Sequence, residues 1–340
     1  MKAQVICDPH PRTMDLLFSP EDRGRLEALA NLHVWNEESR MPGELLEKHL
    51  PEAAAIIGQT DLPQERLDRA KNLRAVINVE SNFLPNVDYE TCFRRGIYVL
   101  STAPAFGQAV AEMSLGLALA LARGIPLADR LFRQGKEVYG RHSNRESFLI
   151  AGSDVGIIGF GNLGRSLLPL LAPFGCTIRV HDPWLPENHL KKLSLVPVSL
   201  AELLAASRIV FVLAGATEEN RAMLGRKEFD LMPEGACLVL VSRAALVDFQ
   251  ALTEKLATGG IRAAVDVFPE EPFPKDHPIR GMDNVILSAH RTGSLASAYL
   301  LMGEMVVDDL AQILKGLPPV RLTQARRETV ARMRSMPIKK

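Results

Sequence analysis

The sequence predicts an α/β protein made of two doubly wound parallel sheets. Short apolar runs of strand length alternate with amphipathic, charge-rich stretches along most of the chain. A glycine-rich turn near residue 160 joins one such run to a helix-like stretch, as in folds where strands and helices alternate. The length of 340 residues exceeds what one typical hydrophobic core holds, so two domains are expected.

The first hundred residues follow this alternation and predict a parallel sheet covered by helices. They lack a glycine-rich turn between strand and helix, which makes this part the better candidate for holding a substrate. Strands are expected at residues 5–7, 32–35, 53–57, 75–79 and 98–100, and helices at 21–30, 44–49, 64–70 and 89–95.

A long, mostly apolar helix is predicted over residues 106–123, and its few charges require that most of its surface is buried. A more polar arm at 124–144 follows it. The alternation then resumes and gives about six strands of a second doubly wound sheet. These strands are expected at 155–158, 177–180, 209–213, 237–241, 263–267 and 285–287, with helices at 200–206, 227–231, 249–258 and 295–315.

The C-terminal residues differ in composition from the rest of the chain. Residues 318–322, which read PPVRL, are expected to form a last edge strand. Residues 325–340 are basic and are expected to form a solvated, mobile terminus, with a site for polyanions as the alternative. The basic side chains are Arg326, Arg327, Arg332, Arg334, Lys339 and Lys340.

Charge and cysteine usage restrict the function further. The 40 Lys and Arg residues match the 40 Asp and Glu residues, which argues against nucleic acid or an anionic membrane as partner. Cys7, Cys92, Cys176 and Cys237 are scattered without a C-x-x-C pair, which is typical of reduced thiols and not of disulfides or metal ligands. No signal peptide is recognised, and the most apolar helical run, 113–122, is too short for a bilayer. We expect a cytoplasmic protein without a metal site.

The glycine-rich turn after residues 155–158 reads G-x-G-x-x-G. The first glycine permits a tight turn, the second lets the backbone approach a pyrophosphate, and the third lets helix and strand pack closely. An acidic residue, Asp182, ends the next strand, where it accepts bonds from ribose hydroxyls and repels a 2′-phosphate. The pattern therefore predicts NAD rather than NADP as cofactor. The expected contacts are Gly159, Phe160, Gly161, Asn162, Leu163, Gly164 and Asp182.

Four polar residues follow three strands at the predicted carboxyl edge of the second sheet, where ligands bind in such folds. Arg243 follows the strand at 237–241, and His290 follows the last strand. Asp266 ends the strand that begins at Ala263, and Glu271 lies in the loop FPEEP just beyond it. An arginine can grip a carboxylate and polarise a carbonyl. A histidine oriented by a carboxylate can move a hydroxyl proton. The set fits oxidation of an alcohol that carries a carboxylate, although each residue alone has an ordinary structural explanation, such as Asp266 capping a turn.

The chain resembles the D-isomer-specific 2-hydroxyacid dehydrogenases over residues 2–320. The segments GFGNLGR, HDP, SRAALVD, AVDVFPEEP and SAHRTGS match the successive motifs of that family. The resemblance implies a Rossmann NAD-binding domain at 104–294, inserted into a flavodoxin-like substrate domain at 1–103 plus 295–340. It also implies a homodimer, with the helix at 106–123 belonging to the NAD domain and its dimer interface.

The resemblance implies roles for individual residues. Arg243 would bind and polarise a 2-oxo acid, His290 would be the acid and base, and Glu271 would pair with His290. Asp266 would contact the nicotinamide carboxamide. The further cofactor contacts implied are Thr217, Val241, Ser242, Arg243, His290 and Gly293.

The loop at 78–83 departs from the family, whose members usually carry a small, glycine-rich loop there that receives the substrate carboxylate. We expect Glu80, Ser81 or Asn82 to face the substrate, together with Arg243 and His290, which suits a larger or hydroxylated 2-oxo acid. Glu80 would repel a substrate carboxylate unless paired, and Arg291 is one candidate partner. The alternative is that Glu80 points to solvent.

Four other departures concern the cofactor site. Leu213, Gly215 and Leu240 replace the His, Pro and Asn common in the family, and Phe106 stands where a polar residue is common. Backbone contacts tolerate such changes, so they affect single contacts and not the reaction.

The sequence therefore predicts an NAD-dependent oxidoreductase that transfers a hydride between nicotinamide and C2 of a D-2-hydroxy acid or 2-oxo acid. The main alternative is an NAD(H)-sensing, non-catalytic scaffold or corepressor-like protein, and a second is oxidation of a non-carbon substrate such as phosphite. Arginine, glutamate and histidine together favour an enzyme, because a sensor needs no proton transfer.

Overall fold

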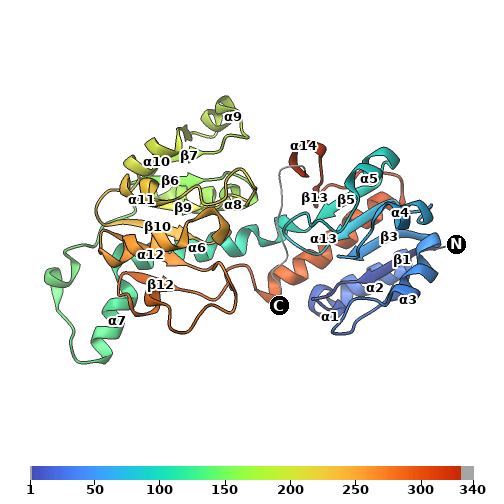
Figure 1. Ribbon diagram of the computed structural model, residues 1–340, viewed down its shortest axis with the longest axis horizontal. Coiled ribbons are helices and arrows are strands. Elements are labelled where there is room, and N and C mark those ends of the chain that lie inside the picture. The colour runs from blue at the N-terminus through green and yellow to red at the C-terminus, as the bar shows by residue number, and fades with distance from the viewer. Residues whose placement is uncertain (1, 331–340) are drawn as a thin grey trace. The chain divides into compact units, whose positions relative to one another are not determined.

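The chain folds into two α/β units, each with its own sheet, in this computed structural model (Figure 1). The structure describes residues 2–330. Residues 2–106 and 294–330 contact mainly one another and make the first unit, and residues 107–293 make the second. The boundaries expected from sequence, 103/104 and 294/295, lie close to these positions. The four basic residues predicted in the tail at 332, 334, 339 and 340 lie outside the described residues.

The sheet of the first unit has the order β2-β1-β3-β4-β5-β13. The first five strands are parallel, and 2-1-3-4-5 is the strand order of flavodoxin-like folds. The strands are β1 (Ala3–Asp8), β2 (Ala30–Val34), β3 (Ala53–Gly58), β4 (Ala75–Asn78), β5 (Tyr98–Ser101) and β13 (Thr323–Gln324).

The predicted edge strand at 318–322 is wrong, because the antiparallel edge strand β13 begins at Thr323. Asp309, which is fully buried, accepts the backbone N–H groups of Val320, Arg321 and Leu322 at 2.7–3.1 Å. Those N–H groups are thus unavailable to a strand ladder.

Alternating strand residues of the first sheet fill two cores, one on each face. Val5, Ile57 and Ile77 pack against the long helix α13, whereas Ile6, Ile56 and Val76 pack against the opposite helices. The helices of this unit are α1 (Met14–Leu17), α2 (Pro20–Leu29), α3 (Gly43–His49), α4 (Gln64–Arg69), α5 (Tyr89–Arg95), α13 (Ala296–Leu314) and α14 (Arg327–Val330).

The sheet of the second unit is entirely parallel, in the order β8-β7-β6-β9-β10-β11-β12. Counted from its first strand, this is the Rossmann order 3-2-1-4-5-6 with one further strand. The strands are β6 (Asp154–Ile158), β7 (Thr177–His181), β8 (Val196–Pro197), β9 (Ile209–Val212), β10 (Ala236–Leu240), β11 (Ile261–Val265) and β12 (Val285–Leu287).

Helices cover both faces of this second sheet, as doubly wound folds require. They are α6 (Gly107–Arg123), α8 (Asn162–Leu171), α9 (Glu187–Lys192), α10 (Leu200–Ala206), α11 (Arg226–Asp230) and α12 (Phe249–Ala257). The helix α7 (Ile125–Arg133) contacts α6 and has no buried residue. Short 3₁₀ turns lie at Leu50–Glu52, Ala103–Phe106, Gly140–Asn144, Ala172–Phe174, Ala244–Leu246 and Pro278–Gly281.

The stretch Ala103–Arg123, which contains α6, is 21 residues long with a mean hydropathy of 1.5. Its length and composition alone would allow it to span a membrane. The apolar run at 113–122 was expected to be too short for a bilayer, and this expectation is corrected. One such helix is weak evidence, because core helices have the same properties. Here α6 packs against α8, β10 and β11, and half of the apolar stretch is buried.

Candidate active site

The glycine-rich turn lies between β6 and α8, as expected. Gly159 has φ +86°, and a Cβ there would lie 2.4 Å from Ala214 Cα. A Cβ on Gly164 would lie 2.9 Å from the carbonyl oxygen of Gly159. A Cβ on Gly161, by contrast, would meet nothing within 4 Å. The first and third glycines are thus required by packing, while the second leaves open space beside the turn.

The start of α8 can accept an anionic group. No side chain caps the N-terminus of this ten-residue helix, so its first N–H groups remain available to phosphate. Gly161 and Asn162 are exposed at this end. The Phe160 ring lies in the core, which leaves only its backbone for a cofactor contact.

Asp182 follows β7 and is tied to the glycine turn. Its Oδ2 accepts the Phe160 N–H at 2.8 Å, and its Oδ1 accepts the Trp184 N–H at 3.0 Å. A carboxylate has about four lone-pair sites, so two remain for ribose hydroxyls. The turn, the helix start and this carboxylate together fit an adenosine diphosphate group.

The loops after β9, β10 and β12 add buried polar groups to the same edge. Thr217 accepts the Asn220 N–H at 3.3 Å, so its hydroxyl holds the loop after β9. Val241 and Ser242 are buried after β10. The hydroxyls of Ser242, Ser288 and Thr292 are buried with no hydrogen-bond partner among the described residues. Such groups indicate an additional partner, which a bound cofactor or water supplies. Sequence reasoning missed Ser288 and Thr292, although both flank His290.

His290 and Glu271 form the expected pair. The imidazole Nδ1 lies 3.1 and 2.9 Å from the two carboxylate oxygens of Glu271. An ionised carboxylate only accepts hydrogen bonds, so Nδ1 carries the proton and Nε2 is the atom that can exchange one. His290 has φ +48°, an uncommon conformation for a residue with a side chain. Strained backbone of this kind is often found at functional sites.

Asp266 shows how the His290 turn is held. Its backbone oxygen accepts the His290 N–H at 2.7 Å. Its buried carboxylate accepts the N–H groups of Arg291 and Thr292, both at 3.1 Å. Asp266 therefore caps a turn, which is the ordinary structural explanation given for it from the sequence. Its contact with the nicotinamide carboxamide stays a prediction. Gly293 lies in the same turn.

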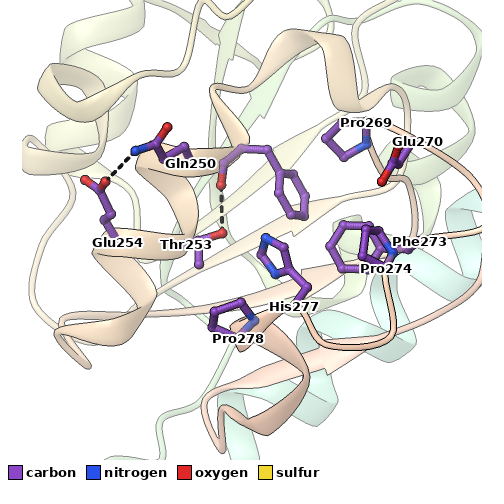
Figure 2. A pocket seen from close by; sticks show the side chains of 10 residues that line it. Gln250, Thr253, Glu254, Pro269, Glu270, Phe273, Pro274, His277 and Pro278 are labelled. Carbon is purple, nitrogen blue, oxygen red and sulfur yellow. Dashed lines mark hydrogen bonds between the residues drawn. The ribbon is translucent and has the colours of Figure 1, made fainter.

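The loop that carries Glu271 is fixed by aromatic packing. Glu271 accepts the Phe268 N–H at 3.2 Å. Phe268 packs against Phe273 in a tilted arrangement with ring centroids 4.4 Å apart, and both rings contact Phe249 at the start of α12. Figure 2 shows the cavity of about 530 Å³ beside this loop, with Pro269 and Phe273 on one side and Thr253 of α12 on the other. This packing holds Glu271 in position for His290.

Arg243 lies three residues after β10, and its Nη1 donates to the Ser242 carbonyl at 2.7 Å. Because β10, β11 and β12 are adjacent parallel strands, their carboxyl ends share one edge. The topology therefore brings Arg243, Glu271 and His290 to that edge, as expected. Their roles in the reaction stay predictions.

In the first unit, the loop after β4 contains Glu80, Ser81 and Asn82, all half-buried. Glu80 is paired with Arg12, whose Nη1 donates to Oε1 at 2.6 Å. The candidate partner Arg291 and the solvent-facing alternative are both corrected by this pair. Sequence reasoning missed Arg12, because nothing local links two residues 68 positions apart.

The two sheets and the nucleotide turn define the class of two-domain, NAD-binding α/β dehydrogenases. The sequence profile of the D-isomer specific 2-hydroxyacid dehydrogenase NAD-binding domain matches residues 115–292. A phosphoglycerate oxidoreductase from Rhizobium etli is 44% identical with a TM-score of 0.86, and the match covers 96% of this chain and 99% of that one. The chain belongs to the D-isomer specific 2-hydroxyacid dehydrogenase family, which confirms the expected family, fold class and NAD cofactor.

Two groups of curated relatives differ in length. The glyoxylate reductase of Aeropyrum pernix is 32% identical over 89% of this chain and 92% of its own length. The D-3-phosphoglycerate dehydrogenase of Archaeoglobus fulgidus is 30% identical over 82% of this chain and 53% of its own. The chain thus spans about half the length of the phosphoglycerate dehydrogenases it matches.

Proposed function

We propose that this protein is an NAD-dependent D-2-hydroxyacid dehydrogenase that also reduces the corresponding 2-oxo acids. The observation that carries the proposal is the His290–Glu271 pair beside the strand end that bears Arg243. Relatives named glyoxylate reductase and D-3-phosphoglycerate dehydrogenase support the same reaction class. Bound NAD supplies hydride exchange with C2 of the substrate.

His290 moves the proton of the C2 hydroxyl. With Nδ1–H bonded to Glu271, Nε2 accepts this proton during oxidation and returns it during reduction. Glu271 keeps the ring oriented and stabilises the imidazolium that forms. The turn held by Asp266 fixes the backbone of the same residue.

Arg243 binds the substrate carboxylate. A guanidinium presents its donors in a planar fork that matches a carboxylate, and a further N–H polarises the C2 carbonyl. The bond from Nη1 to the Ser242 carbonyl helps to hold the guanidinium at the strand end.

A screen of NADH consumption tests the proposal. We expect turnover of at least one of glyoxylate, hydroxypyruvate, pyruvate or phenylpyruvate. In the variant Arg243→Ala, kcat/KM should fall about 10²–10³-fold, since the developing oxyanion loses its charged donor. NADH affinity, measured by fluorescence titration, should fall much less than kcat/KM, because Arg243 is one of many expected cofactor contacts. NADH binding without turnover of any of these acids would instead support the sensing scaffold.

We further propose a cytoplasmic location with a small-molecule partner and no nucleic acid or membrane partner. The balanced charge supports this, and so do four cysteines that are all free. Burial raises the pKa of Cys7 and Cys92 to about 12, so both remain thiols at neutral pH. Such inert thiols suit a reducing compartment.

We also propose a homodimer. The helix α7, labelled in Figure 1, has no buried residue. Large apolar side chains on it and after it are exposed. They include Ile125 at 54%, Phe132 at 62%, Tyr139 at 74% and Leu149 at 68% exposure. Exposed apolar side chains of this kind, on α7 and in the segment after it, favour burial against a second copy.

A further inference from the structure

The cavity of about 530 Å³ beside the Glu271 loop lies entirely within the second unit (Figure 2). One wall is α12, and the other is the loop at 269–278. Glu271 belongs to this loop but does not line the cavity, because its carboxylate is turned to His290. Small-molecule sites have volumes of about 300–1,000 Å³. The cavity therefore has the size of a ligand site, and the proposed reaction does not use it.

Aromatic rings form the apolar part of the cavity. The ring centroids of Phe249 and Phe273 are 5.5 Å apart, and those of Phe273 and His277 are 4.7 Å apart. The loop wall also contains the prolines Pro269, Pro274 and Pro278. Each proline fixes its own φ, so the backbone that carries the rings has little freedom. A wall that is ordered before binding reduces the entropy that a ligand must overcome.

The acidic side chains that line the cavity are not balanced by basic ones. Glu254 of α12 and Glu270 of the loop line it, whereas no Lys or Arg among the described residues does. Glu254 is paired with Arg226 and accepts from Gln250 at 3.1 Å. Glu270 is exposed and has no ion-pair partner within residues 2–330. The cavity thus presents one uncompensated negative charge beside its rings.

The same aromatic wall already holds a cation of the chain on its outer side. Arg280 Cζ lies 5.4 Å from the Phe273 ring centroid. Its guanidinium donates to the carbonyls of Pro274 and Phe273 at 2.7 and 2.9 Å. The face of an aromatic ring carries negative potential and attracts cations. Ring faces and a carboxylate together favour a ligand that combines an apolar body with a positive charge.

We propose that this cavity binds a small organic cation, in which an aromatic ring carries an amine. The ring of the ligand packs against Phe249 and Phe273, and its ammonium group pairs with Glu270. The site is independent of the proposed reaction, because the cavity contains none of the residues assigned to hydride or proton transfer.

The test compares two probes of nearly the same shape, phenethylamine and the neutral phenethyl alcohol. Their binding to the NADH-bound protein is measured by ligand-observed NMR titration, so that the nucleotide site is filled throughout. We expect phenethylamine to bind saturably with a Kd on the order of 1 mM or tighter. Phenethyl alcohol should bind about threefold more weakly or worse, since it lacks the charge.

A charge-removing variant tests the role of the carboxylate. In Glu270→Gln the Kd of phenethylamine should rise about threefold or more, while that of phenethyl alcohol should not change. The matched control is Glu187→Gln, which alters another exposed glutamate of the second unit, on α9 and paired with Lys191 at 2.8 Å. This control should change neither Kd.

A second variant tests where the probes bind. Thr253 lines the cavity from α12, so the larger side chain in Thr253→Phe would fill part of it. Both probes should then bind about tenfold more weakly or worse, and retained NADH binding would show an intact fold. No binding of phenethylamine, equal Kd values for the two probes, an unchanged Kd in Glu270→Gln, or undiminished binding to Thr253→Phe would each overturn the site. A protein that reduces 2-oxo acids but fails this test loses only the cation site.

Discussion

Asp182 accepts a hydrogen bond from the backbone of the glycine turn and is expected to bind the cofactor ribose. One substitution can separate these two roles. Asp182→Asn keeps an oxygen for the Phe160 N–H but removes the charge that repels a 2′-phosphate. We expect the ratio of kcat/KM for NADH over NADPH to fall at least about tenfold, roughly 1.4 kcal/mol of discrimination. Steady-state kinetics with both cofactors would check this. An unchanged ratio would mean that another residue excludes the 2′-phosphate.

Asp8 carries a charge in the core of the first unit. It is 2% exposed at the end of β1, and burial raises the pKa of its carboxyl, while bonds from Met41 and Thr60 and the charge of Arg40 oppose this effect. A pKa raised on folding favours the folded state below the unfolded pKa of about 3.9, and this advantage is lost as pH rises through the folded value.

We therefore expect Asp8→Asn to be more stable than the natural chain at pH 7, with the difference disappearing near pH 3. The asparagine oxygen can still accept the Met41 N–H, so the substitution mainly removes the buried charge. Thermal midpoints measured across this pH range would check the prediction. A variant that is less stable at pH 7 would show that the Arg40 attraction exceeds the cost of burial.

At the scale of single elements, the glycine turn separates a glycine needed for folding from one needed for binding. Gly161→Ala meets no atom within 4 Å, so stability should change by less than about 0.5 kcal/mol. Its methyl group would occupy the space where a pyrophosphate approaches, so the Kd for NADH should rise at least about tenfold. Fluorescence titration and thermal unfolding measure the two effects. Undiminished NADH binding would place the pyrophosphate elsewhere.

Gly159→Ala is the matched comparison. The residue has φ +86°, and the new Cβ would lie 2.4 Å from Ala214 Cα, so the backbone must move. We expect a loss of about 1–3 kcal/mol or more in stability, in contrast to Gly161→Ala. Equal stability of the two variants would contradict the packing argument.

The sequence predicted elements whose signal is local. Buried parallel strands are continuous β-branched runs, so β6 and β9 were expected close to where they occur. The strand β8 (Val196–Pro197) was missed, since two residues carry no periodicity. The helix α7 was also missed, since residues 124–144 were expected to be a polar arm. None of its residues is buried.

At the scale of the site, the sequence identified residues at strand ends but not the contacts between distant segments. His290 and Glu271 were paired correctly because a family motif contains each of them. The partner of Glu80 was not found, because Arg12 comes from another strand end and depends on the order of strands in the sheet. Strand order is a tertiary property, and a run of residues does not encode it locally.

At the scale of the whole molecule, the exposed apolar side chains on and after α7 predict assembly into a dimer. Phe132 of α7 and Leu193 are both large apolar side chains of the second unit, with exposures of 62% and 40%. Only Phe132 lies on α7, so Leu193 serves as the control. Charged groups are depleted from the centre of stable interfaces, since burying an unpaired charge is costly. Phe132→Glu should therefore disrupt a dimer, whereas Leu193→Glu should not.

The measurement is light scattering after size-exclusion chromatography, at micromolar protein. We expect twice the chain mass for the natural protein and for Leu193→Glu, and a single chain mass for Phe132→Glu. Because α7 has no buried residue, the substitution should leave the fold of its own unit intact, as circular dichroism would show. A natural chain that is monomeric at this concentration would contradict the dimer, and a dimeric Phe132→Glu variant would place its interface on another surface.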